Sequence, residues 1–219
     1  MKKNWVVVVV LVFSSSLLCA QQKSPPEAGE KRAVEAKLRN PSEVNKAVPS
    51  VQNTSFESTG ERVLRHEAIV DATLEQAWAA FTTTEGLRTF AAPVVDFELK
   101  TGGKFHSNYQ VGSKVGDPGT IYNTVLAYVP LKMVAFKIGL TDKFPAGPRE
   151  AGTLFAVVEF EKVGNRKVKI ILSMMGWGNG AEWDQVYKHF DWGNAYTLKA
   201  LQERFVKGPW IGTISHPKL

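Results

Sequence analysis

Four histidines are the side chains of this sequence best suited to proton transfer or metal binding: His66, His106, His189 and His216. No two of them lie four residues apart, as two zinc ligands on one helix face would, and no HExxH, GxSxG or Walker-type motif is present. His66 is next to Glu67, and neighbouring residues of a strand point to opposite faces, so the two cannot form an acid–base pair there. We therefore expect no catalytic constellation, no metal site and no cofactor.

A stretch of alternating side chains offers polar groups of another kind. His106 and Asn108 share one face of an expected strand, and Phe105, Ser107 and Tyr109 share the other. Whichever face turns inward brings polar atoms into an apolar interior, where one or two hydrogen bonds would orient a ligand. The alternative is that the polar face points to water.

Large apolar side chains complete the candidate site. Most of the aromatic rings are expected in the core, but a minority could line a pocket. Met174, just before Trp177, is an adaptable side chain that suits a cavity wall. The candidate ligand-binding residues are His106, Asn108, Tyr109, Tyr122, Phe136, Met174, Trp177 and Phe190.

The first twenty residues have the pattern of a secretory signal peptide. Lys2 and Lys3 precede a short apolar run, and Ala20 is a small residue placed for cleavage. A membrane anchor is the alternative, but an uncut span needs about 20 apolar residues, and serines interrupt this run. We expect an exported protein, periplasmic or secreted, with no membrane span.

Cys19 is the only cysteine of the chain. Cleavage after Ala20 would remove it, which excludes a disulfide framework or a thiol nucleophile from the mature protein. The alternative is a lipoprotein signal, in which Cys19 would carry a lipid anchor.

The net charge of +6 comes from 27 basic and 21 acidic residues that are interleaved along the chain. A nucleic-acid-binding protein would gather its basic residues on one stripe among stacking aromatics. No such stripe is present, and we expect no nucleic-acid partner.

Composition and periodicity divide the remaining chain. Residues 21–60 are polar and rich in proline, which predicts a disordered spacer. Residues 61–208 contain the regular patterns of one domain, and residues 209–219 form a short tail. Helical spacing predicts helices over Leu74–Thr82, Thr84–Phe90 and the long Glu182–Lys207. Strands are predicted over Arg62–Val70, Val94–Lys100, Lys104–Val111, Gly119–Val129, Met133–Leu140, Gly152–Val163 and Arg166–Met175.

Three strings in this order resemble the SRPBCC or START-like superfamily, particularly its Hsp90-ATPase-activator-like (AHSA1-type) branch. They are VDATLEQAWAAFTTTEGL from Val70, the Gly102–Phe105 turn, and GWGNGAEWDQVYKHFDWGNAYTLKALQERF from Gly176. The resemblance covers about residues 62–209. It implies an α+β helix-grip fold, in which a curved antiparallel seven-stranded sheet surrounds a long C-terminal helix, with two short helices after the first strand.

The same resemblance implies a cavity between sheet and helix but no single activity. We expect a cofactor-free binding domain that holds a small hydrophobic molecule. One alternative is a cofactor-free cyclase or dehydratase that uses His106 or Tyr109 as acid or base. Another is a protein-interaction module; an ATP-dependent Hsp90 partner does not fit an exported protein.

Overall fold

The computed structural model describes residues 51–209. The expected signal peptide, most of the spacer and nearly all of the tail lie outside these residues. The strands are β1 (Gln52–Asn53), β2 (Phe56–Ser58), β3 (Glu61–Val70), β4 (Val94–Phe97), β5 (Lys104–Asn108), β6 (Ile121–Val129), β7 (Met133–Lys137), β8 (Phe155–Gly164) and β9 (Lys167–Met175). The helices are α2 (Leu74–Thr82), α3 (Thr84–Arg88), α4 (Ala146–Ala151) and α5 (Ala181–Lys207).

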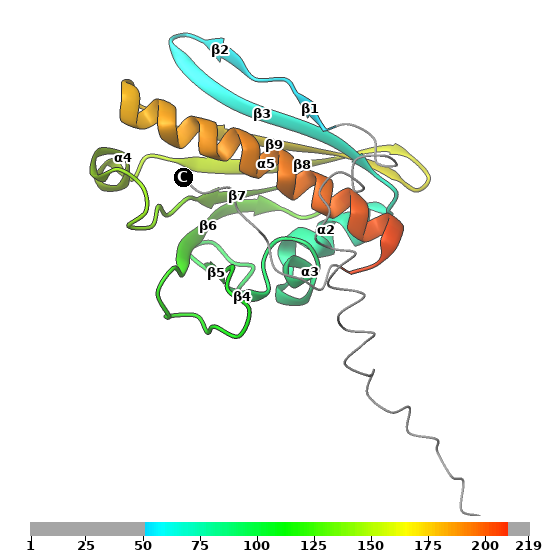
Figure 1. Ribbon diagram of the computed structural model, residues 1–219. Coiled ribbons are helices and arrows are strands. Elements are labelled where there is room, and N and C mark those ends of the chain that lie inside the picture. Colours follow the sequence, from blue (N-terminus) through cyan, green and yellow to red (C-terminus); the bar gives the residue numbers. More distant parts are fainter. Residues whose placement is uncertain (1–50, 210–219) are drawn as a thin grey trace, which may run out of the picture. The chain divides into compact units, whose positions relative to one another are not determined.

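All strands belong to one antiparallel sheet in the order β1-β3-β9-β8-β7-β6-β5-β4, with β2 also paired to β3. Figure 1 shows α5 lying across one face of this sheet, with α2 and α3 near its C-terminal end. The seven predicted strands, the two short helices and the long C-terminal helix are all present. The helix-grip fold expected from the sequence is confirmed.

The face of the sheet under α5 is set by alternation along β3. Leu64, Ala68 and Val70 are at most 3% exposed, whereas Ile69 between them is 45% exposed. Burying this face stabilises the fold by about 25 cal/mol for each Å² of apolar surface removed from water. His66 has the same parity as the buried residues, and it too faces α5.

A capping box begins α2. The Thr73 hydroxyl accepts a hydrogen bond from the Gln76 amide, and the Gln76 side chain accepts one from the Thr73 amide. These two bonds satisfy backbone donors that have no partner within the helix. α2 therefore begins at Leu74, as the helical spacing predicted.

The end of the predicted spacer is not disordered. Residues 52–53 and 56–58 form β1 and β2, which both pair with β3. The Thr54 amide also donates to the Arg65 carbonyl at 2.9 Å. The stabilising contacts are backbone hydrogen bonds to a strand edge, and the side chains of both strands are exposed, so no alternation of buried apolar residues marked them in the sequence. Two short strands are thus added to the seven expected.

Helix α4 was also missed, because Gly147 and Pro148 are ordinarily turn residues. Within residues 51–209, no helix is long and apolar enough to cross a membrane.

Candidate functional site

Three aromatic rings lie on the inner face of the β4–β7 half of the sheet. Phe105 lies 5.7 Å from Phe97 and 5.0 Å from Phe136, measured between ring centroids. Strand register explains the grouping, because Phe97 is directly opposite Phe105 in the β4–β5 pair. Phe97 and Phe105 are only half-buried, whereas Phe136 is 3% exposed. Phe136 therefore lies in the core and packs beneath the two more exposed rings.

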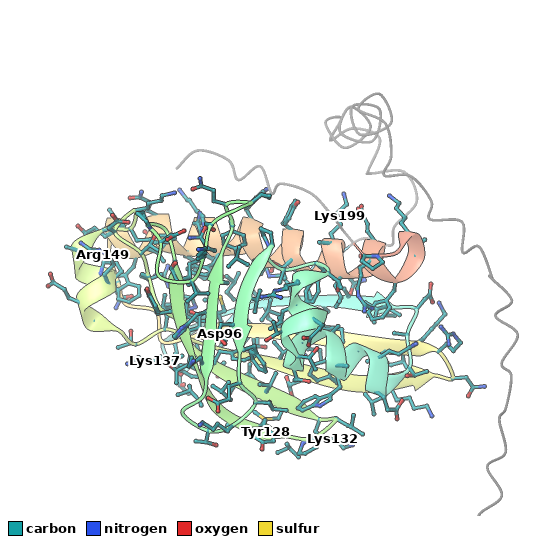
Figure 2. The ribbon with its side chains drawn as sticks, turned by 90° about the horizontal axis from the view of Figure 1, so that it is seen from below. Asp96, Tyr128, Lys132, Lys137, Arg149 and Lys199 are labelled. Atoms are coloured by element: carbon teal, nitrogen blue, oxygen red, sulfur yellow. The ribbon has the colours of Figure 1, made fainter. Side chains whose placement is uncertain are left out.

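His106 and Tyr122 lie on the outer face, away from α5. They are directly opposite each other on β5 and β6, and their rings meet edge to face at 4.8 Å. Tyr122 is 54% exposed. In Figure 2, Asp96, the β4 partner of His106, lies on the strands, below α5 in this view. The expectation that His106 and Tyr122 face a ligand between sheet and helix is wrong, because Phe105 and Phe97 take the inward positions.

Asn108 is buried but holds a loop in place. Its amide donates to the Pro118 carbonyl at 3.2 Å and to the Thr120 hydroxyl at 3.3 Å. Its side-chain oxygen accepts from the Gln110 amide at 2.9 Å. These bonds engage both the nitrogen and the oxygen of the side chain, so Asn108 has a structural role. The prediction that it contacts a ligand is wrong.

Tyr109 follows β5 with the inward parity of Phe105. Burial raises the pKa of its hydroxyl above the usual value, and the nearby Tyr196 of α5 raises this pKa further. The hydroxyl therefore stays protonated at neutral pH. Of the predicted polar residues, Tyr109 is the one that the structure places between sheet and helix.

A second aromatic cluster covers the N-terminal half of α5. Trp177 lies 4.9 Å from Tyr187 and 6.1 Å from Phe190, and Phe144 stacks on Phe190 at 6.0 Å. The Trp177 indole donates to the Met174 carbonyl at 2.9 Å, which fixes the ring. The structure thus brings Trp177 and Phe190 together.

Met174, which was predicted to line the ligand site together with Trp177 and Phe190, lies deeper in the structure. It is 1% exposed and belongs to the hydrophobic core. Its side chain supports the site rather than lining it, and its expected place on a cavity wall is corrected.

Sequence reasoning missed a polar contact between β3 and α5. His66, 2% exposed, places its Nε2 atom 3.1 Å from Oδ1 of Asp191. The same carboxylate oxygen accepts from the Asn53 amide at 2.8 Å. Burial lowers the pKa of His66, although the charge and hydrogen bond of Asp191 oppose the shift. In the sequence, 125 residues separate Asp191 from His66.

The contact is one of several that attach α5 to β3. Arg62 forms an ion pair with Asp184 at 2.7 Å near the start of the helix. Gln202 donates to the Ile69 carbonyl at 3.0 Å near its end. The apolar pattern of β3 could have revealed His66, since Leu64 and Ala68 on either side of it mark the inward face.

A separate groove of about 440 Å³ lies between α3, β4 and the loop near Ser113. Its lining includes Thr84, Arg88, Asp96 and Lys114. Val94, Val95 and Val115 also line the groove, but an apolar ligand there would have to desolvate its charged groups. Among residues 51–209, no group of three or more His, Cys, Asp or Glu side chains is placed to hold a metal ion.

A sequence model for the family described as "Activator of Hsp90 ATPase homolog 1-like protein" matches residues 71–205, more than half of the chain. No curated protein matched the sequence. Among solved structures, the Aha1 dimer from Colwellia psychrerythraea is 17% identical with a TM-score of 0.53, covering 67% of this chain and 97% of that one.

Two further structures are similar to the same extent. Protein MLL2253 from Mesorhizobium loti is 16% identical with a TM-score of 0.51, covering 65% of this chain and 95% of its own. Protein SSP2350 from Staphylococcus saprophyticus is 13% identical with a TM-score of 0.51, covering 71% and 97%. At such identities the likeness shows the fold alone.

Proposed function

Because the chain belongs to the family of Activator of Hsp90 ATPase homolog 1-like proteins, we propose that it holds a small hydrophobic ligand between α5 and the β4–β7 half of its sheet. The proposal includes no cofactor. It also includes export: Lys2, Lys3, the apolar run and Ala20 support cleavage and release from the cytoplasm.

The observation that carries this proposal is the incomplete burial of aromatic side chains on both walls. Phe97 and Phe105 point inward from the sheet, and Phe190 packs on the core from α5, yet all three are only partly buried. An inward-facing ring that keeps solvent contact borders space that another molecule can enter. Small-molecule sites are typically lined by such apolar and aromatic side chains, with a few polar groups that fix orientation.

Native mass spectrometry of the protein purified from its source tests the proposal. We expect a co-purifying apolar molecule of defined mass, and we expect 1-anilinonaphthalene-8-sulfonate to fluoresce when added to the delipidated protein. A protein that is consistently empty and does not take up this dye would contradict the proposal.

A protein-interaction function is the second candidate, and one surface favours it. Tyr122, Leu126 and Val129 of β6 are 54%, 41% and 52% exposed. A row of exposed apolar side chains on one strand is a common feature of interaction surfaces. A stable partner captured by the wild-type protein but not by a Tyr122→Ser/Leu126→Ser variant would favour this function over ligand binding.

The acid–base enzyme is less well supported than either. His106, its expected catalytic group, points away from α5, and Tyr109 keeps its proton because burial raises its pKa.

A further inference from the structure

The groove between α3, β4 and the loop near Ser113 has the dimensions of a small-molecule site. Its volume of about 440 Å³ is within the usual range for such sites. It lies beside β4, the last strand in the order of the sheet, and its lining includes none of the aromatic side chains of the ligand site proposed above. Two basic side chains, Arg88 and Lys114, line it together with the apolar side chains of Val94 and Val115.

Side chains from α3 already occupy the backbone groups at this edge of β4. Arg88 donates to the Val95 carbonyl at 2.9 Å. The Thr84 hydroxyl accepts from the Phe97 amide at 3.2 Å and donates to the Phe97 carbonyl at 3.4 Å. A peptide that extended the sheet would need these backbone groups as partners. The occupant that fits the groove is therefore a small molecule rather than an added strand.

The two cationic groups remain available to bind such a molecule. A guanidinium group has five N–H donors, and the bond from Arg88 to the β4 backbone leaves most of them free. Lys114 is exposed, and it takes part in no ion pair with the rest of the described chain. Asp96 also lines the groove, but its carboxylate is paired with Lys104 at 3.2 Å. The groove thus combines net positive charge with an apolar surface.

We propose that this groove binds a small organic acid, whose carboxylate contacts Arg88 and Lys114 and whose short aliphatic chain packs on Val94 and Val115. Hydrogen bonds from guanidinium and ammonium groups to a carboxylate are among the strong ones in proteins. A neutral apolar molecule would remove water from both cations without replacing it. An inorganic anion would leave the valine side chains without a partner. This site is independent of the ligand proposed between α5 and the sheet.

Three small probes test the proposal on the full chain. They are 4-methylpentanoate, its uncharged analogue 4-methylpentanamide, and acetate, which has the charge without the branched chain. Binding is followed in ¹⁵N–¹H spectra, in which the backbone amides of Val94 and Lys114 report on the groove and those of Phe105 and Phe190 on the aromatic site. We expect 4-methylpentanoate to bind about tenfold more tightly than either analogue and to shift the groove amides. Added salt should weaken its binding but not that of the amide.

A lysine substitution tests the contact directly. Lys114→Gln should weaken the binding of 4-methylpentanoate about threefold or more and leave that of the amide unchanged. Lys132→Gln is the matched control, because it removes the same charge from an exposed lysine outside the groove. Asp96→Asn removes the carboxylate beside the anion and should tighten binding about twofold. Arg88 is kept, since it also bonds to the Val95 carbonyl.

The possible outcomes separate this inference from the proposed function. Equal binding of the acid and the amide, or equal weakening by Lys114→Gln and Lys132→Gln, would show that the groove does not recognise a carboxylate. Shifts at Phe105 and Phe190 in place of the groove amides would assign the probe to the aromatic site and overturn the inference. If no probe binds, the inference fails while the proposed ligand under α5 is unaffected. The comparison of probes on wild-type protein needs no substitution, so it is decisive even if a variant does not fold.

Discussion

The pairing of His66 with Asp191 shows how burial and charge compete at one residue. Loss of water around the ring disfavours its charged form, while the carboxylate favours that form. Burial is the larger effect, so the folded protein holds the ring neutral over a wider pH range than the unfolded chain does. His189, packed edge to face against Phe144, also has a pKa lowered by burial.

This difference predicts a loss of stability in mild acid. The unfolded chain has an ordinary histidine pKa of about 6.5, and the folded state has a lower one, so the unfolded state binds more protons as pH falls. The contribution is complete above about pH 6.5 and is lost as pH falls through the folded pKa. Urea midpoints measured from pH 7.5 to 5 should fall, and His66→Gln should reduce the slope. His189→Gln measures the share of the second ring; a slope unchanged by His66→Gln would contradict the assignment.

At the residue scale, the sequence shows which side chains share a face of a strand. It does not show which of the two faces turns toward the helix. Alternation along β5 correctly separated His106 from Phe105 but did not say which of them faced the helix. The neighbours decide this: Phe97 and Phe136, on other strands, form the apolar surface that Phe105 joins. The His66–Asp191 contact was out of reach because it depends on how α5 is placed over β3.

At the scale of elements, local chemistry determined most boundaries. α2 spans the residues that were predicted, because its cap is encoded in four neighbouring residues. α4 and β2 were missed because distant partners stabilise them: Phe144, just before α4, stacks on Phe190, and β2 pairs with β3. On α5, Leu198 is fully buried, whereas the neighbouring Thr197 is only half-buried.

The cap at Thr73 is a direct test of local encoding. Thr73→Ala removes the acceptor for the Gln76 amide, and we expect it to lower the free energy of unfolding by about 1 kcal/mol. Chemical denaturation followed by circular dichroism measures the loss. Thr101→Ala, at an exposed turn before β5, is the matched control and should change stability by less than about 0.5 kcal/mol. An equal effect at both positions would show that the capping box contributes nothing.

Replacing glycine by alanine is expected to change stability in opposite directions at two helical positions, Gly86 and Gly193. A Cβ atom at Gly86 of α3 would lie 2.2 Å from the Ala79 carbonyl oxygen of α2, so Gly86→Ala forces the two helices apart. We expect a loss of about 1–3 kcal/mol. Around Gly193 of α5 a Cβ atom would meet nothing within 4 Å, so Gly193→Ala should stabilise by about 0.5–1 kcal/mol through helix propensity. Thermal unfolding of both variants compares the signs; a loss at Gly193 would mean that this face of α5 is more tightly packed than the structure indicates.

At the scale of the whole molecule, α5 faces two parts of the sheet that differ in chemistry. Along β3 it is held by Arg62, His66 and Gln202, through polar contacts at three separate points. Toward β4 and β5 the inward side chains are aromatic and partly buried. Lys199 marks the side of α5 that points away from the sheet (Figure 2). Because α5 is fixed along β3, near one side of the sheet, the β4–β7 half remains for the ligand that we propose.

The N-terminal residues lead to the last prediction, which concerns processing of the full chain. The pattern around Ala20 predicts a mature protein that begins at Gln21, whereas a lipoprotein signal would leave an acylated Cys19. Mass spectrometry of the protein from its native host distinguishes the two. Limited proteolysis should then cut within the polar residues 21–50 and spare the segment from Val51, because β1 and β2 are paired to β3 and Asn53 bonds to Asp191. A stable fragment that begins after residue 60 would show that these strands do not remain attached, and an intact Met1 would show that no signal is removed.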